Sequence, residues 1–203
     1  MIKFKKIKKE IRIVGIDDGP LNIFRDKHKK SIIIGTIFRG GRLLEGVIKD
    51  EVEVDGMDST EKIINIIKRS SHKDIRVIML DGITFAGFNI VDIKKLYRET
   101  NLGVIAVTRK FPNFEKIKNA LKNFDDGEKR WKLIMKSGKI HKVEVKNDAG
   151  KQGQVYFQKA GLYLKDAKEI IKISTTRGLI PEPLRIAHII ASGIVNGESH
   201  GDA

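Results

Sequence analysis

Two short, mainly apolar runs that each end in an aspartate constrain the fold of this chain most strongly. The first run covers residues 11–16 and is followed by Asp17, and the second covers residues 75–80 and is followed by Asp81. Runs of this length and composition are typical of buried strands. A residue directly after such a strand lies at the sheet edge where open α/β proteins place their sites. If the two strands are neighbours, Asp17 and Asp81 therefore lie close together.

Two carboxylates that meet at a sheet edge indicate a metal site. Converging negative charges repel each other unless a divalent cation lies between them, and oxygen ligands suit Mg²⁺ or Mn²⁺ better than Zn²⁺. This pattern predicts a metal-dependent phosphoryl-transfer centre on Asp17 and Asp81. The alternative is local, because Asp is also favoured in turns and helix caps: Asp17 and Asp18 would then form a turn, and Asp81 would cap the next helix.

The charge balance favours a polyanionic partner. The chain has 203 residues, with 40 Lys and Arg against 26 Asp and Glu, which gives a net charge of +14. Such a field attracts nucleic acid. The chain has no cysteine, which excludes disulfides, thiolate zinc sites and a cysteine nucleophile. Its apolar runs are far shorter than the ~20 residues of a spanning helix, so we expect a cytoplasmic protein with no membrane partner.

The order of the expected elements predicts an α/β fold with a mixed central sheet. Three initial strands joined by short turns are followed by alternating strands and helices. The expected strands cover residues 11–16, 31–38, 42–54, 75–80 and 103–107, and the expected helices cover residues 58–68, 89 or 91 to 98, and 113–122. Right-handed crossovers and short connections leave few topologies for this order. Among them, the ribonuclease H-like arrangement places the first and fourth strands side by side.

The last third of the chain adds further elements. Residues 125–153 are polar and rich in turn residues around two short runs, 131–135 and 140–145, which we interpret as an inserted hairpin. A strand is expected over residues 155–158, and helices are expected over residues 164–175 and 182–191. The whole chain, residues 1–203, is therefore expected to form one domain.

Three stretches of the chain resemble an archaeal group of endonuclease V-like proteins. They are Gly-Ile-Asp-Asp-Gly-Pro at 15–20, Leu-Asp-Gly-Ile-Thr-Phe-Ala-Gly-Phe-Asn at 80–89 and Gly-Leu-Ile-Pro-Glu-Pro-Leu-Arg-Ile-Ala-His at 178–188. The last stretch is similar to the Pro-Glu-Pro-x-Arg-x-Ala tail of endonuclease V. Some members of this group are described as deoxyuridine endonucleases. The resemblance therefore implies a ribonuclease H-like nuclease over nearly the full length.

The resemblance also implies which residues form the site. Asp17 and Asp81 match the endonuclease V metal ligands on the first and fourth strands. Arg109 or Lys110 matches a lysine region expected near the substrate phosphate. Both basic residues follow the strand after Asp81, so they can position phosphates at the same sheet edge without reading sequence.

The third acidic ligand is less clearly defined. In endonuclease V a glutamate lies just before the first long helix, and Asp58 occupies that place here, with Asp55 close by. Asp58 also suits the cap of the helix, whereas Asp55 ends the third strand and could face the same edge. The resemblance favours Asp58 as the third catalytic carboxylate and metal ligand. Asp18 is a further candidate for binding metal or orienting water.

Other residues near Asp81 are candidates for contacting a nucleotide. An unstacked base could stack on Phe85, and Asn89 could donate to a nucleotide. Each has a local alternative, since Phe85 also suits the core and Asn89 also suits turn hydrogen bonds. His188, on the last expected helix, is interpreted as structural or exposed, because a lone histidine more often has such a role.

Together these features predict a Mg²⁺- or Mn²⁺-dependent endonuclease for DNA repair. Its expected substrate is DNA, single-stranded or damaged, cleaved near a deaminated base of the deoxyuridine kind. The alternative is a noncatalytic nucleic-acid-binding protein that retains the fold. A small-molecule phosphatase would use similar acids but would gain nothing from a net charge of +14.

Overall fold

The computed structural model describes residues 1–21 and 30–199. The strands are β1 (Arg12–Asp18), β2 (Lys30–Arg39), β3 (Leu43–Glu53), β4 (Val77–Asp81), β5 (Thr84–Phe85), β6 (Asn89–Ile90), β7 (Gly103–Thr108), β8 (His141–Lys146) and β9 (Gln152–Ala160). The helices are α1 (Ser59–Arg69), α2 (Ile93–Thr100), α3 (Phe114–Leu121), α4 (Gly127–Lys136), α5 (Leu164–Ser174) and α6 (Glu182–Asn196).

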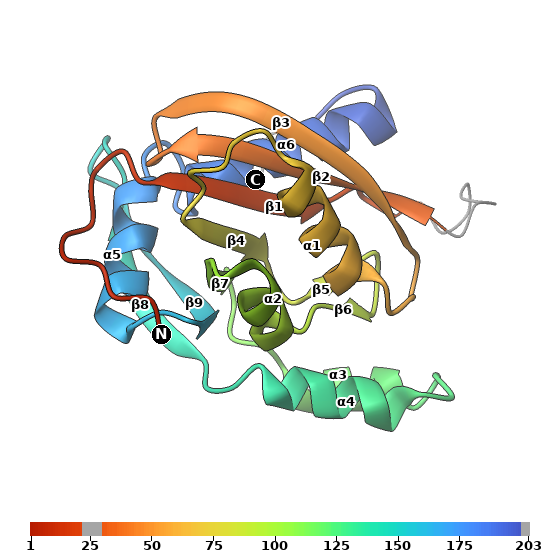
Figure 1. Cartoon of the computed structure of the whole chain (residues 1–203). Helices are drawn as coiled ribbons and strands as arrows, with labels where there is room; N and C mark the ends of the chain where they lie inside the picture. The colour runs from red at the N-terminus through yellow and green to blue at the C-terminus, as the bar shows by residue number, and fades with distance from the viewer. Residues whose placement is uncertain (22–29, 200–203) are drawn as a thin grey trace.

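A seven-stranded mixed sheet in the order β3-β2-β1-β4-β7-β9-β8 forms the centre of the molecule (Figure 1). Strand β2 is antiparallel to both β1 and β3, and β1, β4 and β7 are parallel. The prediction of three antiparallel strands followed by alternating elements is confirmed. So is the prediction that the first and fourth strands of the main sheet are neighbours.

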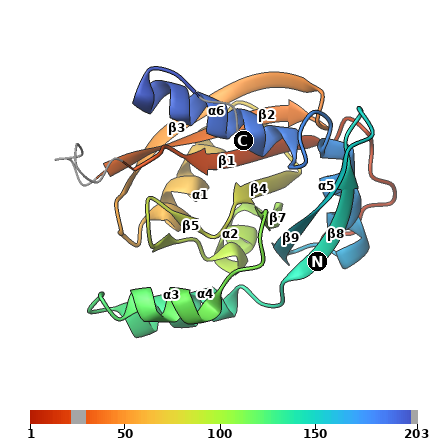
Figure 2. The same cartoon turned by 180° about the vertical axis from the view of Figure 1, so that it is seen from behind.

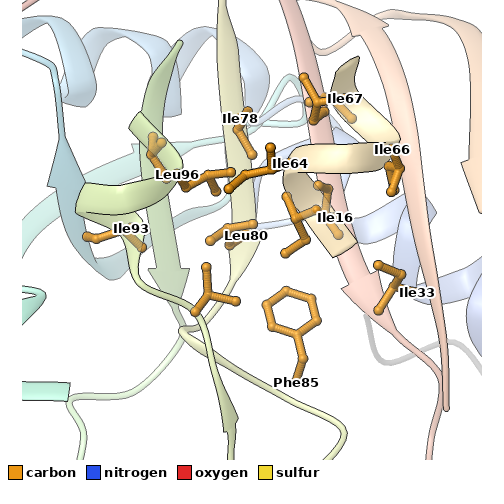
Figure 3. Packing of buried hydrophobic residues seen from close by; sticks show 14 of the residues in the cluster. Ile16, Ile33, Ile64, Ile66, Ile67, Ile78, Leu80, Phe85, Ile93 and Leu96 are labelled. Carbon is orange, nitrogen blue, oxygen red and sulfur yellow. The ribbon is translucent and has the colours of Figure 1, made fainter. Parts of the chain in front are cut away.

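Helices cover both faces of the sheet because the strand side chains alternate between two apolar cores. Ile16 packs with Ile64 of α1, as Figure 3 shows. Val14, two residues before Ile16, belongs to the same core. Ile13 points to the opposite face of the sheet and belongs to the second core, with Ile170 of α5. Helices α1 and α2 therefore lie on one face, with α5 and α6 on the other (Figure 2). No helix within the described residues has the length and apolar character needed to cross a membrane.

The region of the expected inserted hairpin is built differently from the prediction. Residues 131–135 belong to α4 rather than to a strand, and Ile134 packs with Leu121 of α3 and Ile90 of β6. A run of five residues is too short for its periodicity to separate a strand from a helix, and here the contacts with α3 decide. The hairpin lies further along the chain, where β8 pairs with β9.

Candidate active site

Asp17 and Asp81 lie side by side at the carboxyl ends of two central strands. Strands β1 and β4 are parallel and Ile16 is paired with Leu80, so the next residue of each strand reaches the same level of the sheet edge. One carboxylate oxygen from each aspartate and one ring nitrogen of His188 all lie within 4.8 Å of one another. The predicted convergence of Asp17 and Asp81 on adjacent parallel strands is confirmed.

His188 enters this group through the packing of α6 on β1. A Cβ atom at Gly15 would lie 2.4 Å from the carbonyl carbon of Pro183, so only glycine allows the helix to approach this closely. The hydroxyl of Thr36 donates to the carbonyl of Pro183 at 2.6 Å and fixes the helix start. From Pro183, five helical residues advance about 7.5 Å. From Gly15, two strand residues advance about 6.7 Å. Because the two advances are similar, His188 on α6 reaches the same level as Asp17 on β1.

The imidazole of His188 is paired with Asp17. Its Nδ1 atom lies 2.8 Å from Oδ2 of Asp17, which is buried. This hydrogen bond, together with the charges of Asp17 and Asp81, raises the pKa of His188 although burial opposes the shift. The interpretation of His188 as a structural or exposed residue therefore missed its position. The available signal was its place at the end of the third family-like stretch, residues 178–188.

The charge of the group is incompletely compensated. Burial, followed by the negative charge of Asp17, raises the pKa of Asp81 to about 6, and the positive charges of Arg109 and His188 act in the opposite direction. A raised pKa means that the hydrogen bonds and positive charges around a carboxylate do not offset the cost of its negative charge. A cation bound here would supply the missing compensation.

Asp18 lies next to the group and is held by the β5–β6 hairpin. Its Oδ2 atom accepts a hydrogen bond of 2.7 Å from the backbone N–H of Ala86. Burial, followed by the charge of Asp17, raises the pKa of Asp18 to about 7. Asp18 is thus a carboxyl group that exchanges its proton near neutral pH, beside the group formed by Asp17, Asp81 and His188.

Asp55 and Asp58 do not join this group within the described residues, and both are used in holding loops together. Asp55 has a φ of 54° and accepts a hydrogen bond of 2.8 Å from the N–H of Phe88. Asp58 accepts from the side-chain amide of Asn89 at 2.6 Å and from the N–H of Glu53 at 3.1 Å. Its side chain makes no cap hydrogen bond to α1. The geometry does not support Asp58 as the third ligand and favours His188 in that place.

The two residues expected to contact a nucleotide are buried. Phe85 is 0% exposed and packs in the core beside Ile16 and Leu80, as Figure 3 shows. Asn89 is also 0% exposed, and its side chain accepts from the N–H of Ser59 as well as donating to Asp58. A base cannot reach either side chain in this conformation. The local alternatives, core packing for Phe85 and loop hydrogen bonding for Asn89, are the ones observed.

The basic residues expected near the phosphate lie at the same sheet edge as the acids. Arg109 and Lys110 follow β7, and both are exposed. Arg109 is near enough to Asp81 for its charge to lower the pKa of that carboxyl. A phosphate at the acidic group would therefore find a cationic side chain beside it.

The donor set of the acidic group suits a divalent cation. Carboxylate oxygens of Asp17 and Asp81 are ligands that Mg²⁺ and Mn²⁺ prefer, and the ring nitrogen of His188 is a common ligand for transition metals. The mixed set of oxygen and nitrogen atoms fits Mn²⁺ at least as well as Mg²⁺. Asp18 adds a further carboxylate next to these three residues.

Sequence comparison places the chain among archaeal relatives. A family model described as Endonuclease dU matches residues 9–195. A UPF0215 protein of Methanosarcina mazei is 52% identical over 199 residues, covering 97% of this chain and 97% of the relative. A UPF0215 protein of Methanothermobacter thermautotrophicus is 51% identical over 203 residues, covering 98% and 95% of the two chains.

Structural comparison identifies the fold. A crystal structure of a protein of unknown function from Archaeoglobus fulgidus matches with a TM-score of 0.77 and 37% identity, covering 90% of this chain and 97% of that chain. Endonuclease V of Ciona intestinalis, solved in complex with DNA containing an inosine, matches with a TM-score of 0.55 and 14% identity, covering 87% and 82%. These likenesses confirm the prediction of a ribonuclease H-like fold.

Proposed function

The chain belongs to the Endonuclease dU family, and from this premise we propose that it is a metal-dependent endonuclease that cleaves DNA near a deaminated base such as deoxyuridine. The observation that carries the proposal is the meeting of Asp17, Asp81 and His188, whose ligand atoms lie within 4.8 Å of one another. The proposed physiological role is DNA repair.

The metal of the proposed reaction is Mg²⁺ or Mn²⁺, held by Asp17, Asp81 and His188. When bound, such a cation supplies charge neutralisation at the phosphate and lowers the pKa of a water molecule. The incomplete compensation of Asp81, whose pKa is raised to about 6, supports a cation at this position.

The other residues of the site have roles that follow from their contacts. Asp17 fixes the ring of His188 through the hydrogen bond of 2.8 Å to Nδ1. Asp18, with a pKa raised to about 7, can accept a proton on the oxygen that does not bind Ala86, or return it. Arg109 and Lys110 can contact the phosphates on either side of the cut.

The partner in this proposal is DNA, and charge supports it. The net charge of +14 gives the protein a long-range attraction for a polyanion. This attraction is independent of sequence, so recognition of a damaged base needs contacts of another kind.

A nicking assay tests the proposal. Strands that carry one uracil, inosine or xanthine, and an unmodified strand, are incubated with the protein in Mn²⁺, in Mg²⁺ and in a chelator. We expect cleavage of at least one deaminated strand that requires metal. Asp17→Asn and His188→Ala should reduce the rate by about 10²–10³-fold, because each removes a group that acts on the charged transition state. The exposed Asp125 and the half-buried His72, both outside this group, supply the matched controls Asp125→Asn and His72→Ala, which should cut normally.

The noncatalytic alternative predicts a different result in the same assay. A binding protein would retain the DNA in a mobility-shift experiment but would cut no strand in any metal. The proposal is also overturned if Asp17→Asn and His188→Ala cut at the wild-type rate, because the reaction would then not depend on this group.

A further inference from the structure

A pocket of about 530 Å³ opens beside the proposed active site. Gly82 and Arg109 both line it, and Gly82 directly follows Asp81 in the chain. The N–H of Gly82 donates to the carbonyl of Val107 at 2.7 Å, which fixes this end of β4 against β7. A strand whose phosphate lay at Asp81 would therefore have one of its nucleotides at the mouth of the pocket.

The lining of the pocket is mainly apolar and aromatic. Ile117 of α3 and Ile134 of α4 line it, together with Phe157 of β9. Phe111 lines it as well and is 56% exposed. Its ring meets Phe114 and Tyr156 in edge contacts with centroid distances of 6.2 and 5.6 Å. An exposed aromatic ring beside an apolar pocket is a stacking surface for a flat ligand.

We propose that this pocket receives a single unstacked nucleobase of the strand being cut, with Phe111 as its stacking partner and Gln158 as the residue that distinguishes a deaminated base from its parent. The inference deepens the proposed function and rests on it. A pocket of about 530 Å³ is large enough for one nucleoside. The cationic side chains of Arg109 and Lys110 at its border match the phosphates that a base brings with it.

The orientation of the Gln158 amide is set by the protein. Its Nε2 atom donates to the carbonyl of Gly138 at 2.8 Å, and a carbonyl oxygen can only accept, so the nitrogen must face Gly138. The Oε1 atom is left as an acceptor. Gln158 is 9% exposed and lines the pocket, and among the described residues no partner is assigned to this oxygen.

A fixed acceptor distinguishes a deaminated base from the base it came from. Cytosine and adenine present an unprotonated ring nitrogen, which is an acceptor, beside the exocyclic amine. Deamination converts them to uracil and hypoxanthine, in which that ring nitrogen carries a proton and is a donor. Oε1 of Gln158 can pair with the ring N–H of the product, whereas two acceptors would face each other with the parent base. Thymine and guanine also carry a ring N–H, so the discrimination applies to product against parent.

The first test compares Gln158→Leu with a matched control on the same strand. Gln154 lies on β9 outside the pocket, so Gln154→Leu removes the same group elsewhere. Binding is measured in Ca²⁺ on otherwise identical single strands that carry uracil or cytosine at one position. We expect wild type and Gln154→Leu to prefer the uracil strand by about tenfold, and Gln158→Leu to lose that preference. An unchanged preference in Gln158→Leu would overturn the assignment of Gln158.

The second test removes the stacking ring with Phe111→Ala. The control is Tyr163→Ala, because Tyr163 is an exposed aromatic residue, 39% exposed, outside the pocket. Wild type should bind a uracil strand about tenfold more tightly than the same strand with an abasic site, since stacking of one base supplies that order of affinity. Phe111→Ala should bind the two strands alike, and Tyr163→Ala should retain the difference. If Phe111→Ala retains it too, the base does not use this pocket.

These binding tests separate the pocket from the proposed function. If wild type cuts no strand but Phe111→Ala and Gln158→Leu change binding as expected, the base pocket stands and the nuclease proposal fails. If wild type cuts the uracil strand and neither variant changes the binding preference, the nuclease proposal stands and the pocket assignment fails.

Discussion

Two groups of acidic residues differ in what their oxygen atoms contact: Asp17 and Asp81 at the ends of β1 and β4, and Asp55 and Asp58 in the loop before α1. Asp17 and Asp81 face each other and His188, whose Nδ1 is hydrogen-bonded to Asp17. Asp55 and Asp58 each accept hydrogen bonds from loop groups, the N–H of Phe88 in one case and the amide of Asn89 in the other. The first group holds excess negative charge at a sheet edge, whereas the second connects the loop before α1 to the β5–β6 hairpin.

The contrast indicates which acidic residues belong to the functional site and which stabilise loops. A carboxylate that already accepts its hydrogen bonds from neighbouring loops stabilises those loops and has little capacity left for a cation. Two buried carboxylates whose negative charges face each other destabilise the fold at neutral pH, and a pKa perturbed in this way is characteristic of functional sites. The raised pKa of Asp81, about 6, is the sign of the second situation. The predictions below test whether the two groups separate in this way.

The largest effect is expected for Asp81→Asn. Asparagine has nearly the same shape but carries no charge, so it should reduce metal-dependent cleavage by about 10²–10³-fold. The melting temperature without metal should stay the same or rise at neutral pH, because burial and Asp17 disfavour the charged form of Asp81. Cleavage rates and thermal unfolding curves check the two parts. A variant that loses both activity and folding would place Asp81 with the loop-stabilising acids instead.

The second largest effect is expected for Gly15→Ala, which acts on His188 from a distance. The added methyl group would lie 2.4 Å from the backbone of Pro183, so α6 must move. Overpacking of this kind costs about 1–3 kcal/mol. We expect cleavage to fall by about tenfold or more, because displacing the helix displaces the imidazole.

The control for Gly15→Ala lies on α6 itself. Gly193→Ala introduces a methyl group with no heavy atom within 4 Å, and it should leave cleavage unchanged while stabilising α6 by about 0.5–1 kcal/mol. Equal activity in Gly15→Ala and Gly193→Ala would show that the position of α6 does not matter for the reaction.

A smaller effect on activity is expected for Asp58→Ala. This variant removes the acceptor for the amide of Asn89 and for the N–H of Glu53, so it should destabilise the protein by about 1–3 kcal/mol. Cleavage should stay within about tenfold of wild type, because Asp58 lies outside the group formed by Asp17, Asp81 and His188. Loss of all cleavage with an unchanged melting temperature would restore Asp58 as the third ligand, as the family resemblance implies.

The parts of the fold that could be predicted from sequence are those fixed by short-range pattern. The strands ending at Asp17 and Asp81 are strongly apolar, and the order of the elements left few ways to arrange them, so their adjacency followed. The helix at residues 127–136 was missed because its five-residue apolar run fits either a helix or a strand. Contacts with α3, which the pattern does not contain, decide between the two.

The parts of the site that could not be predicted depend on contacts between distant segments. His188 meets Asp17 across 171 residues of sequence, through the close approach of Gly15 and Pro183. Asp58 looks like a ligand or a helix cap in the sequence, and its hydrogen bond to Asn89 spans 31 residues. Neither partner is visible from local spacing, because each is set by how a helix or hairpin packs on the sheet.

The smallest effect is expected in the pH dependence of stability, and it should depend on the acidic residues around His188. The pKa of Asp18 is raised to about 7, that of Asp81 to about 6, and that of His188 is raised as well. For each group the protonated form is favoured in the folded state. The stability that this contributes is complete at low pH and is lost as the pH rises through the folded-state pKa values.

The melting temperature of the protein in a chelator should therefore fall, on the order of 5 °C, between about pH 5 and about pH 8. Asp18→Asn should flatten this slope most, because the pKa of Asp18 is raised further than that of Asp81. The asparagine can still accept the hydrogen bond from Ala86. Asp55→Asn should keep the wild-type slope even though it lowers the melting temperature throughout, since Asp55 lies among the acids that accept hydrogen bonds from loop groups. If Asp55→Asn flattens the slope and Asp18→Asn does not, the excess charge lies in the loops before α1, and the contrast between the two acidic groups is reversed.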